Sequence, residues 1–171
     1  RLIREGIARV CKPYDDDYWL QRDTDGRFPD EFCDAIAAAG YLGIAMPEEY
    51  GGSGMGITEA ATMVQAITET GAANAGFAAI AINIFGLNPV VVFGTEEQKR
   101  RWLPPIVSRK DTACFAVTEP NTGLDTTRLK TRADWDGTHW VVNGQKTWTS
   151  TAQKATKMLL IARTRPESET E

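Results

Sequence analysis

Two short segments in the second half of the chain carry residue types that could hold a flat aromatic ligand. In the first, NGQKTWTS at 143–150, strand-like alternation places Lys146, Trp148 and Ser150 on one face. An indole ring offers packing area to a heteroaromatic ring, and a hydroxyl fixes the position of a polar edge. The same pattern also fits a core tryptophan followed by a serine at a strand end, so both interpretations stay open.

The second segment, AVTEPNTGL at 116–124, begins like a strand and then turns. Pro120 ends any ladder of hydrogen bonds, and the residues that follow it tolerate unusual backbone dihedrals. Such a loop leaves backbone amides free to hold an oxygen-rich edge or a phosphate, although most loops of this composition are ordinary turns. Glu119, between Thr118 and Pro120, suits a role in fixing the loop better than a role as a catalytic base.

The spacing of apolar residues, which predicts the elements that position these segments, changes near residue 111. Before that point apolar residues recur at helical spacing, which predicts amphipathic helices. Pro29 suits a first helical turn, Gly40 suits a helix end, and Thr58 can cap the following helix. The run TEEQ at 95–98 has the pattern of a capping box. The run at 73–87 is apolar almost all round, so we expect a helix buried on most sides.

After residue 111 the period becomes two, and strands are predicted in the segments 112–119, 138–150 and 157–165. Asp136-Gly137 and Asn143-Gly144 are turn or bulge signals. Helices first and strands second predict an α+β fold of two segregated units, rather than a doubly wound sheet. The glycines of YGGSGMG at 50–56 do not fit a dinucleotide-binding GxGxxG motif, so we expect a plain loop there.

Composition excludes several classes of function. The chain has 171 residues, of which 42% are hydrophobic. Its formal net charge is -4, so it lacks the excess of positive charge that is typical of proteins that bind nucleic acid. The cysteines are widely spaced, which disfavours a disulfide framework and fits a reducing cytoplasm. With a single histidine and no CxxC motif, we expect no metal site. We also find no signal-peptide pattern and no uninterrupted apolar run of about 18 residues, and expect no membrane span.

Taken together, these segments resemble the acyl-CoA dehydrogenase family. The resemblance rests on FAVTEPNTGLDTTRLKTRA at 115–133, NGQKTWTS at 143–150 and the preceding NPVVVFGTEEQKRRWLPPI at 88–106, which occur in order and at the family's spacing. It implies an all-α N-terminal domain at 1–112, then an incomplete antiparallel β-barrel middle domain at 113–171. It also implies FAD as cofactor, an acyl-CoA substrate oxidised at its alpha and beta carbons, an electron-transfer flavoprotein-like acceptor, and a homo-oligomer.

The resemblance also assigns cofactor-binding positions, which are Phe115, Val117, Thr118, Gly123, Leu124, Trp148 and Ser150. Trp148 corresponds to the aromatic plate against the flavin. Ser150 stands where the family usually has threonine, and its hydroxyl can make the same hydrogen bond. Gly123 matches a loop glycine whose missing side chain lets the backbone approach cofactor or substrate.

Leu124 is the main departure from the family pattern. The family most often has a serine there that touches the flavin phosphate and the CoA arm, and leucine removes that hydroxyl. Either the pantetheine is anchored in another way, which we favour because the surrounding residues keep the pattern, or the ligand differs from an ordinary straight-chain thioester. Candidates for substrate contacts are Phe85, Leu87, Val91 and Leu124, although core packing explains the first three equally well.

No catalytic residue is assigned within the chain. In the family the base is a glutamate of a C-terminal helical domain, which this chain does not reach. The chain begins at Arg1 rather than at a methionine and stops just after a strand-like run, so we expect both ends to be cut. The isolated chain is predicted to bind FAD weakly and to turn over no acyl-CoA. Two alternatives stay open: a flavin-dependent monooxygenase or oxidase on the same scaffold, and a non-catalytic binding or assembly module.

Overall fold

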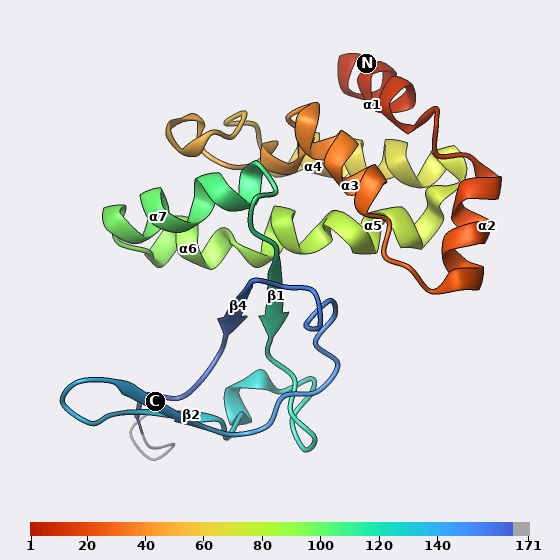
Figure 1. Cartoon of the computed structure of the whole chain (residues 1–171). Coiled ribbons are helices and arrows are strands. Elements are labelled where there is room, and N and C mark those ends of the chain that lie inside the picture. Colours follow the sequence, from red (N-terminus) through yellow and green to blue (C-terminus); the bar gives the residue numbers. More distant parts are fainter. Residues whose placement is uncertain (166–171) are drawn as a thin grey trace. The chain divides into compact units, whose positions relative to one another are not determined.

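The structure is a computed structural model of the chain and describes residues 1–165. It divides into two compact units, Arg1–Thr112 and Ala113–Glu171, which are considered separately below (Figure 1). The first unit is helical and the second contains the strands. This order confirms the mixed helix and strand fold predicted from the change of hydrophobic period.

The helical unit is built from amphipathic helices around one apolar core. Its α-helices are α1 (Leu2–Cys11), α2 (Asp16–Asp25), α3 (Asp30–Ala38), α4 (Ile57–Ile67), α5 (Ala73–Ala81), α6 (Asn88–Phe93) and α7 (Glu96–Val107). Short 3-10 or π segments are η1 (Tyr41–Gly43), η2 (Glu48–Tyr50), η3 (Thr68–Ala72) and η4 (Ile82–Gly86). The core includes Ile7, Phe32, Ile36, Met63 and Ile80, all fully buried. Burial of such side chains supplies the main driving force for folding of this unit.

The capping signals read from the sequence hold at two positions and fail at a third. Thr95 and Gln98 form the predicted capping box: Gln98 N donates to Thr95 Oγ1 at 3.2 Å, and Thr95 N donates to Gln98 Oε1 at 2.9 Å. Gly40 adopts φ 79 just beyond α3, as expected of a glycine at a helix end. Thr58 is not a cap, because α4 begins at Ile57 with Gly56 as its N-cap residue.

The apolar run at 73–87, part of a longer helical run from Ile57 to Phe93, is less deeply buried than its composition predicted. Phe85 is 49% exposed, and Ala75 and Ala78 are also exposed, so the expectation of burial on most sides is wrong. The longer run is interrupted where Gly71 adopts φ 90 in η3. By length and composition alone the run is long and apolar enough to cross a membrane. The predicted absence of a membrane span therefore stays a prediction.

Arg109 ties the end of α7 to α3. Its backbone has φ 59, a left-handed conformation that ends the helix. Its guanidinium Nη2 lies 2.6 Å from Asp30 Oδ1, and its Nη1 contacts Asp34 Oδ1. The arginine side chain is only 10% exposed. These charge-assisted hydrogen bonds fix the last residues of the helical unit against its core helices.

The β unit contains two separate ribbons. Strands β1 (Ala113–Ala116) and β4 (Lys157–Leu160) pair in parallel, whereas β2 (Arg132–Trp135) and β3 (Trp140–Asn143) form an antiparallel hairpin. The predicted antiparallel sheet is therefore wrong for β1 and β4, because a long crossover rather than a hairpin joins them. The sheet is not closed within the described residues. A bridge links the ribbons: Ala133 N donates to Arg163 O, and Arg163 N to Thr131 O, both at 2.8 Å.

The two turn signals of the β unit have different outcomes. Asp136-Gly137 does form the hairpin turn, with Gly137 at φ 102 and Asp136 Oδ1 accepting hydrogen bonds from the backbone N–H groups of Thr138 and His139. Gly144 instead lies so close to the backbone of Thr131 that an added Cβ would be 2.7 Å from Thr131 Cα. Only glycine therefore fits at this position. The strand predicted at 138–150 stops at Asn143, and no strand is assigned from Gly144 to Ser150.

Candidate functional site

The structure brings together the two segments that could hold a flat ligand. The Thr147 backbone N–H donates to the Thr118 carbonyl oxygen at 2.9 Å, so Thr118 lies beside the residue that directly precedes Trp148. Val117 and Thr118 directly follow β1 and are half-buried. Phe115, inside β1, is also half-buried. The residues that follow β1 thus contact an irregular segment, whereas β1 itself pairs with β4.

Trp148 has an unusual backbone and an uncovered side chain. Its φ is 58, a left-handed conformation that is costly for a bulky residue, and its side chain is 91% exposed. The alternative of a core tryptophan is therefore wrong for the β unit as described. A strained backbone that presents a large aromatic ring to the surroundings is the kind of outlier that accompanies binding sites.

The alternation predicted for Lys146, Trp148 and Ser150 also fails. The Lys146 side chain is only 9% exposed, whereas Trp148 and Ser150 are both exposed. Alternation requires extended backbone, and the left-handed turn at Trp148 breaks it. The three side chains therefore do not share one strand face, and Lys146 belongs to the interior.

Lys146 pairs with Glu119 inside the β unit, an interaction that the sequence did not reveal. Lys146 Nζ lies 2.9 Å from Glu119 Oε1 and 2.8 Å from the Val117 carbonyl oxygen. Glu119 also accepts backbone hydrogen bonds from Lys130 N at 2.6 Å and Thr131 N at 2.8 Å. One carboxylate thus connects the loop after β1, the approach to β2 and the segment after β3.

The pKa of Glu119 reflects this environment. Burial acts to raise the pKa, but hydrogen bonds from Thr131, Lys130 and Lys146 outweigh it and lower the pKa from 4.5 to about 2. A carboxylate held ionised in this way is a poor proton acceptor at neutral pH. The arrangement favours the loop-fixing role predicted for Glu119 over a role as catalytic base.

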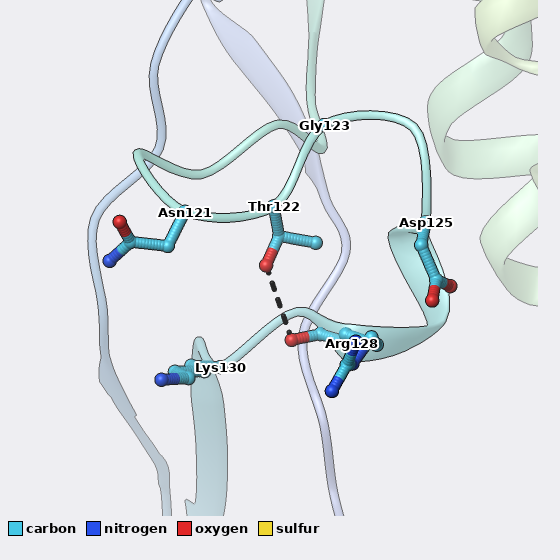
Figure 2. A pocket seen from close by; sticks show the side chains of 6 residues that line it. All are labelled: Asn121, Thr122, Gly123, Asp125, Arg128 and Lys130. Carbon is cyan, nitrogen blue, oxygen red and sulfur yellow. Dashed lines mark hydrogen bonds between the residues drawn. The ribbon is translucent and has the colours of Figure 1, made fainter.

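The loop that follows Glu119 forms an open pocket of about 450 Å3. Figure 2 shows its lining residues, which are Asn121, Thr122, Gly123, Asp125, Arg128 and Lys130. Thr122 is buried, and its Oγ1 donates to the Arg128 carbonyl oxygen at 3.3 Å, which fixes the loop across the short 3-10 segment η5 (Thr126–Arg128). Gly123 is exposed, and nothing lies within 4 Å of the position a Cβ would take.

The pocket lining carries two cations, from Arg128 and Lys130, and one carboxylate, from Asp125, so its net charge is positive. Neither the Arg128 guanidinium nor the Lys130 ammonium forms an ion pair with any residue in the described range 1–165. Two cations beside exposed loop backbone can bind phosphate oxygens. Leu124, adjoining the pocket in sequence, has a fully exposed side chain and offers no hydrogen bond.

The candidate substrate residues of the helical unit differ in exposure. Phe85, in η4, is 49% exposed, Val91 in α6 is half-buried, and Leu87 is only 6% exposed. Phe85 therefore presents an apolar surface, whereas Leu87 packs as a core residue. Leu124 belongs to the β unit.

Comparison with known proteins identifies the family. Residues 1–110 match the model described as "Acyl-CoA dehydrogenase, N-terminal domain", and residues 114–171 match that of "Acyl-CoA dehydrogenase, middle domain". The chain therefore belongs to the acyl-CoA dehydrogenase family, and the resemblance read from the TEP and NGQKTW segments is confirmed. Membership of this family supports an oxidoreductase.

Individual relatives extend well beyond the chain. Acyl-CoA dehydrogenase FadE12 of Mycobacterium tuberculosis is 30% identical over 165 residues, covering 95% of this chain and 42% of FadE12. The FAD complex of PigA matches with a TM-score of 0.87 and 26% identity, covering 96% of this chain and 43% of PigA. The prolyl acyl carrier protein oxidase AnaB matches with a TM-score of 0.88 and 28% identity, over 98% of this chain and 44% of AnaB. The chain spans less than half the length of each.

Proposed function

We propose that the chain provides the N-terminal domain, 1–112, and the middle domain, 113–171, of an FAD-dependent acyl-CoA dehydrogenase. The reaction is oxidation of an acyl-CoA thioester to the 2,3-enoyl-CoA. The observation that carries the proposal is the uncovered indole of Trp148, held on a left-handed backbone directly after Thr147, whose N–H donates to the Thr118 carbonyl oxygen. Family membership and the similarity to the FAD complex of PigA support the same cofactor.

The polar groups around Trp148 fit a flavin. The Thr118 backbone N–H, the Thr118 hydroxyl and the Ser150 hydroxyl have no hydrogen-bond partner within residues 1–165. A flat ring with a hydrogen-bonding edge can satisfy these groups while it packs against the indole. The proposed cofactor-binding residues are Phe115, Val117, Thr118, Gly123, Leu124, Trp148 and Ser150. When bound, FAD supplies the hydride acceptor, and the chain's residues orient it and exclude water.

The pocket beside Gly123 supplies the anchor that Leu124 lacks. We assign Arg128 and Lys130 to a phosphate of the cofactor or of the thioester carrier, because both side chains line the pocket without an ion pair in the described part of the chain. The proposed substrate-binding residues are Phe85, Leu87 and Val91 in the helical unit and Leu124 in the β unit. The exposure of Phe85 supports its place in that set.

The remaining parts of the proposal concern what completes the site. The base is proposed to be a glutamate of a C-terminal helical domain, and the β ribbons to form part of a barrel that further chain closes. The exposed apolar side chains of the hairpin, which are Trp135, Trp140, Val141 and Val142, support such a covering partner. We further propose a cytoplasmic homo-oligomer in fatty acid metabolism, with an electron-transfer flavoprotein-like acceptor.

A second candidate is an oxidase on the same scaffold. It is favoured by the match to AnaB, a prolyl acyl carrier protein oxidase, at a TM-score of 0.88. The leucine at position 124, where the family usually has a serine, fits a thioester carrier other than CoA. The two candidates differ in the electron acceptor, which is a partner flavoprotein or dye for a dehydrogenase and molecular oxygen for an oxidase.

The test compares the isolated 171-residue chain with the complete protein. We expect the complete protein to purify yellow and to reduce a dye when an acyl-CoA is added without oxygen. The isolated chain should retain little FAD and show no turnover, because it lacks the proposed base. Hydrogen peroxide formation in air without dye reduction would favour the oxidase, and a colourless complete protein would contradict both candidates.

Gly123 offers a second test. Gly123→Ala should leave the melting temperature unchanged, because an added Cβ meets no atom within 4 Å. If the loop backbone approaches the cofactor or thioester, the same methyl should weaken binding of one of them about tenfold, or about 1.4 kcal/mol. Gly123→Val should weaken it further. Isothermal titration with FAD and with an acyl-CoA measures this; wild-type affinity for both in the two variants would remove Gly123 from the site.

A further inference from the structure

We propose that Lys146 polarises the Val117–Thr118 peptide, strengthening the Thr118 N–H as a hydrogen-bond donor to the flavin, and that Glu119 holds Lys146 in place. Lys146 and Glu119 are thus positioning residues that raise the reduction potential of the flavin. The inference rests on the proposed function, because it concerns the same cofactor.

The geometry places an ammonium group directly on the relevant carbonyl. Lys146 Nζ lies 2.8 Å from Val117 O, within charge-assisted hydrogen-bond distance. The same Nζ lies 2.9 Å from Glu119 Oε1, and the two side chains are only 9% and 6% exposed. Because both groups are shielded from water, their effect on a neighbouring peptide is weakly screened.

The orientation of Glu119 is fixed independently of Lys146. Its carboxylate accepts hydrogen bonds from Lys130 N and Thr131 N, and its own backbone exchanges hydrogen bonds with Thr122 at 2.9 and 3.1 Å. These bonds hold the carboxylate still, and the carboxylate in turn fixes the ammonium. Lys146 therefore cannot swing to solvent without leaving a buried carboxylate unpaired, which is costly.

The carbonyl that accepts from Lys146 and the N–H of Thr118 belong to one peptide unit. A positively charged donor on the oxygen draws electron density from that unit and makes its N–H a stronger donor, as in other chains of polarised hydrogen bonds. The Thr118 N–H has no acceptor within residues 1–165, while the Thr118 carbonyl is already occupied by Thr147 N. The strengthened donor is thus the one left for a ligand.

The consequence for a bound flavin follows from charge. Reduction adds electron density to the ring, so a stronger donor at its edge stabilises the reduced form more than the oxidised form. Removing the ammonium from Val117 O should lower the potential. This effect differs from a loss of packing. A loss of packing would weaken the binding of oxidised and reduced FAD equally, whereas loss of the ammonium changes the ratio of the two affinities.

The main experiment measures the flavin midpoint potential of the complete protein. For Lys146→Met we expect the affinity for reduced FAD, relative to oxidised FAD, to fall about tenfold, which is about 30 mV for a two-electron couple. The matched control is Arg132→Met, which removes a cation of the same unit that is 56% exposed, and it should leave the potential unchanged. An unchanged potential in a folded, yellow Lys146→Met variant would overturn the inference.

A double variant guards against loss of folding. Glu119→Gln combined with Lys146→Gln removes both charges while keeping hydrogen-bonding side chains, so it leaves no uncompensated buried charge. It should show a lowered potential with FAD still bound. A potential equal to that of the wild type in this variant would likewise count against polarisation by Lys146.

A measurement without cofactor separates this inference from the proposed function. In the cofactor-free protein the Thr118 amide proton resonance should shift upfield in Lys146→Met and stay in place in Arg132→Met. If the wild type binds no FAD, the proposed function fails, whereas the Thr118 resonance still tests the polarisation. An unshifted Thr118 resonance in the folded Lys146→Met variant would refute it.

Discussion

Removing either partner of the buried Glu119–Lys146 pair is expected to cost the β unit about 3–5 kcal/mol of its free energy of unfolding. Glu119→Gln leaves the Lys146 ammonium in a site where it is 9% exposed, and Lys146→Met leaves the Glu119 carboxylate unpaired. The cost comes mainly from an uncompensated buried charge. The double variant Glu119→Gln/Lys146→Met should therefore lose less than the sum of the single losses. Urea unfolding followed by fluorescence measures these changes.

The matched control is the exposed ion pair of the same unit. Arg132 Nη2 lies 2.6 Å from Asp134 Oδ1, with the two side chains 56% and 52% exposed. Asp134→Asn should change the free energy of unfolding by less than about 1 kcal/mol, because water already solvates both groups. Equal losses for Asp134→Asn and Glu119→Gln would show that burial does not strengthen the Glu119–Lys146 pair.

The same pair predicts a dependence of stability on pH. The pKa of Glu119 is lowered from 4.5 to about 2 in the folded state, so its contribution is fully present above about pH 4.5. As the pH falls from 4.5 towards 2, the unfolded state takes up the proton first, and this contribution is lost. The stability of the wild type should therefore fall more steeply over that window than that of Glu119→Gln. Parallel curves would contradict the lowered pKa.

Trp148→Ala is expected to reduce FAD affinity strongly while leaving the fold intact. The indole is 91% exposed, so its removal sacrifices little packing within the described residues. Ring packing against a cofactor is worth about 2 kcal/mol when apolar area and aromatic geometry are combined, which is about thirtyfold in affinity. Trp148→Phe should retain part of this. Fluorescence titration with FAD measures the effect in the complete protein.

The control for Trp148 is another exposed tryptophan of the β unit. Trp135 is 55% exposed and lies in the hairpin, 5.4 Å from the ring of Trp140. Trp135→Ala should leave FAD affinity unchanged. Trp148→Gly adds a separate check, because glycine accepts φ 58 without strain and should keep the melting temperature at or above the wild-type value. FAD affinity unaffected by Trp148→Ala would remove the aromatic plate from the proposal.

Local signals in the sequence predicted most of the helical unit. The Thr95–Gln98 capping box and Gly40 depend on residues a few positions apart, so their pattern can be read directly. The exposure of Phe85 could not be read in this way, because it depends on which helices pack against the run that contains it. Composition alone does not distinguish an apolar residue in a core from one on a surface.

The β unit was harder to predict because its decisive contacts join distant residues. No local pattern shows that Glu119 pairs with Lys146 or that β1 pairs with β4 in parallel. At Trp148 the backbone is left-handed, so the rule that alternate side chains share one face does not hold for Lys146, Trp148 and Ser150. The family resemblance predicted that the segments of Thr118 and Trp148 lie together, and the hydrogen bond from Thr147 N to Thr118 O joins these segments, whereas the pocket around Arg128 and Lys130 was not foreseen.

The parallel pairing of Ala113–Ala116 with Lys157–Leu160 has a consequence for biosynthesis. The earlier strand emerges from the ribosome long before its partner, whereas the β2–β3 hairpin can close as soon as its own turn has been made. We therefore expect the nascent chain to carry a provisional hairpin beside a strand with an open hydrogen-bonding edge. Such an edge is a recognised site of misassociation, and it stays unpaired until Leu160 has left the ribosome.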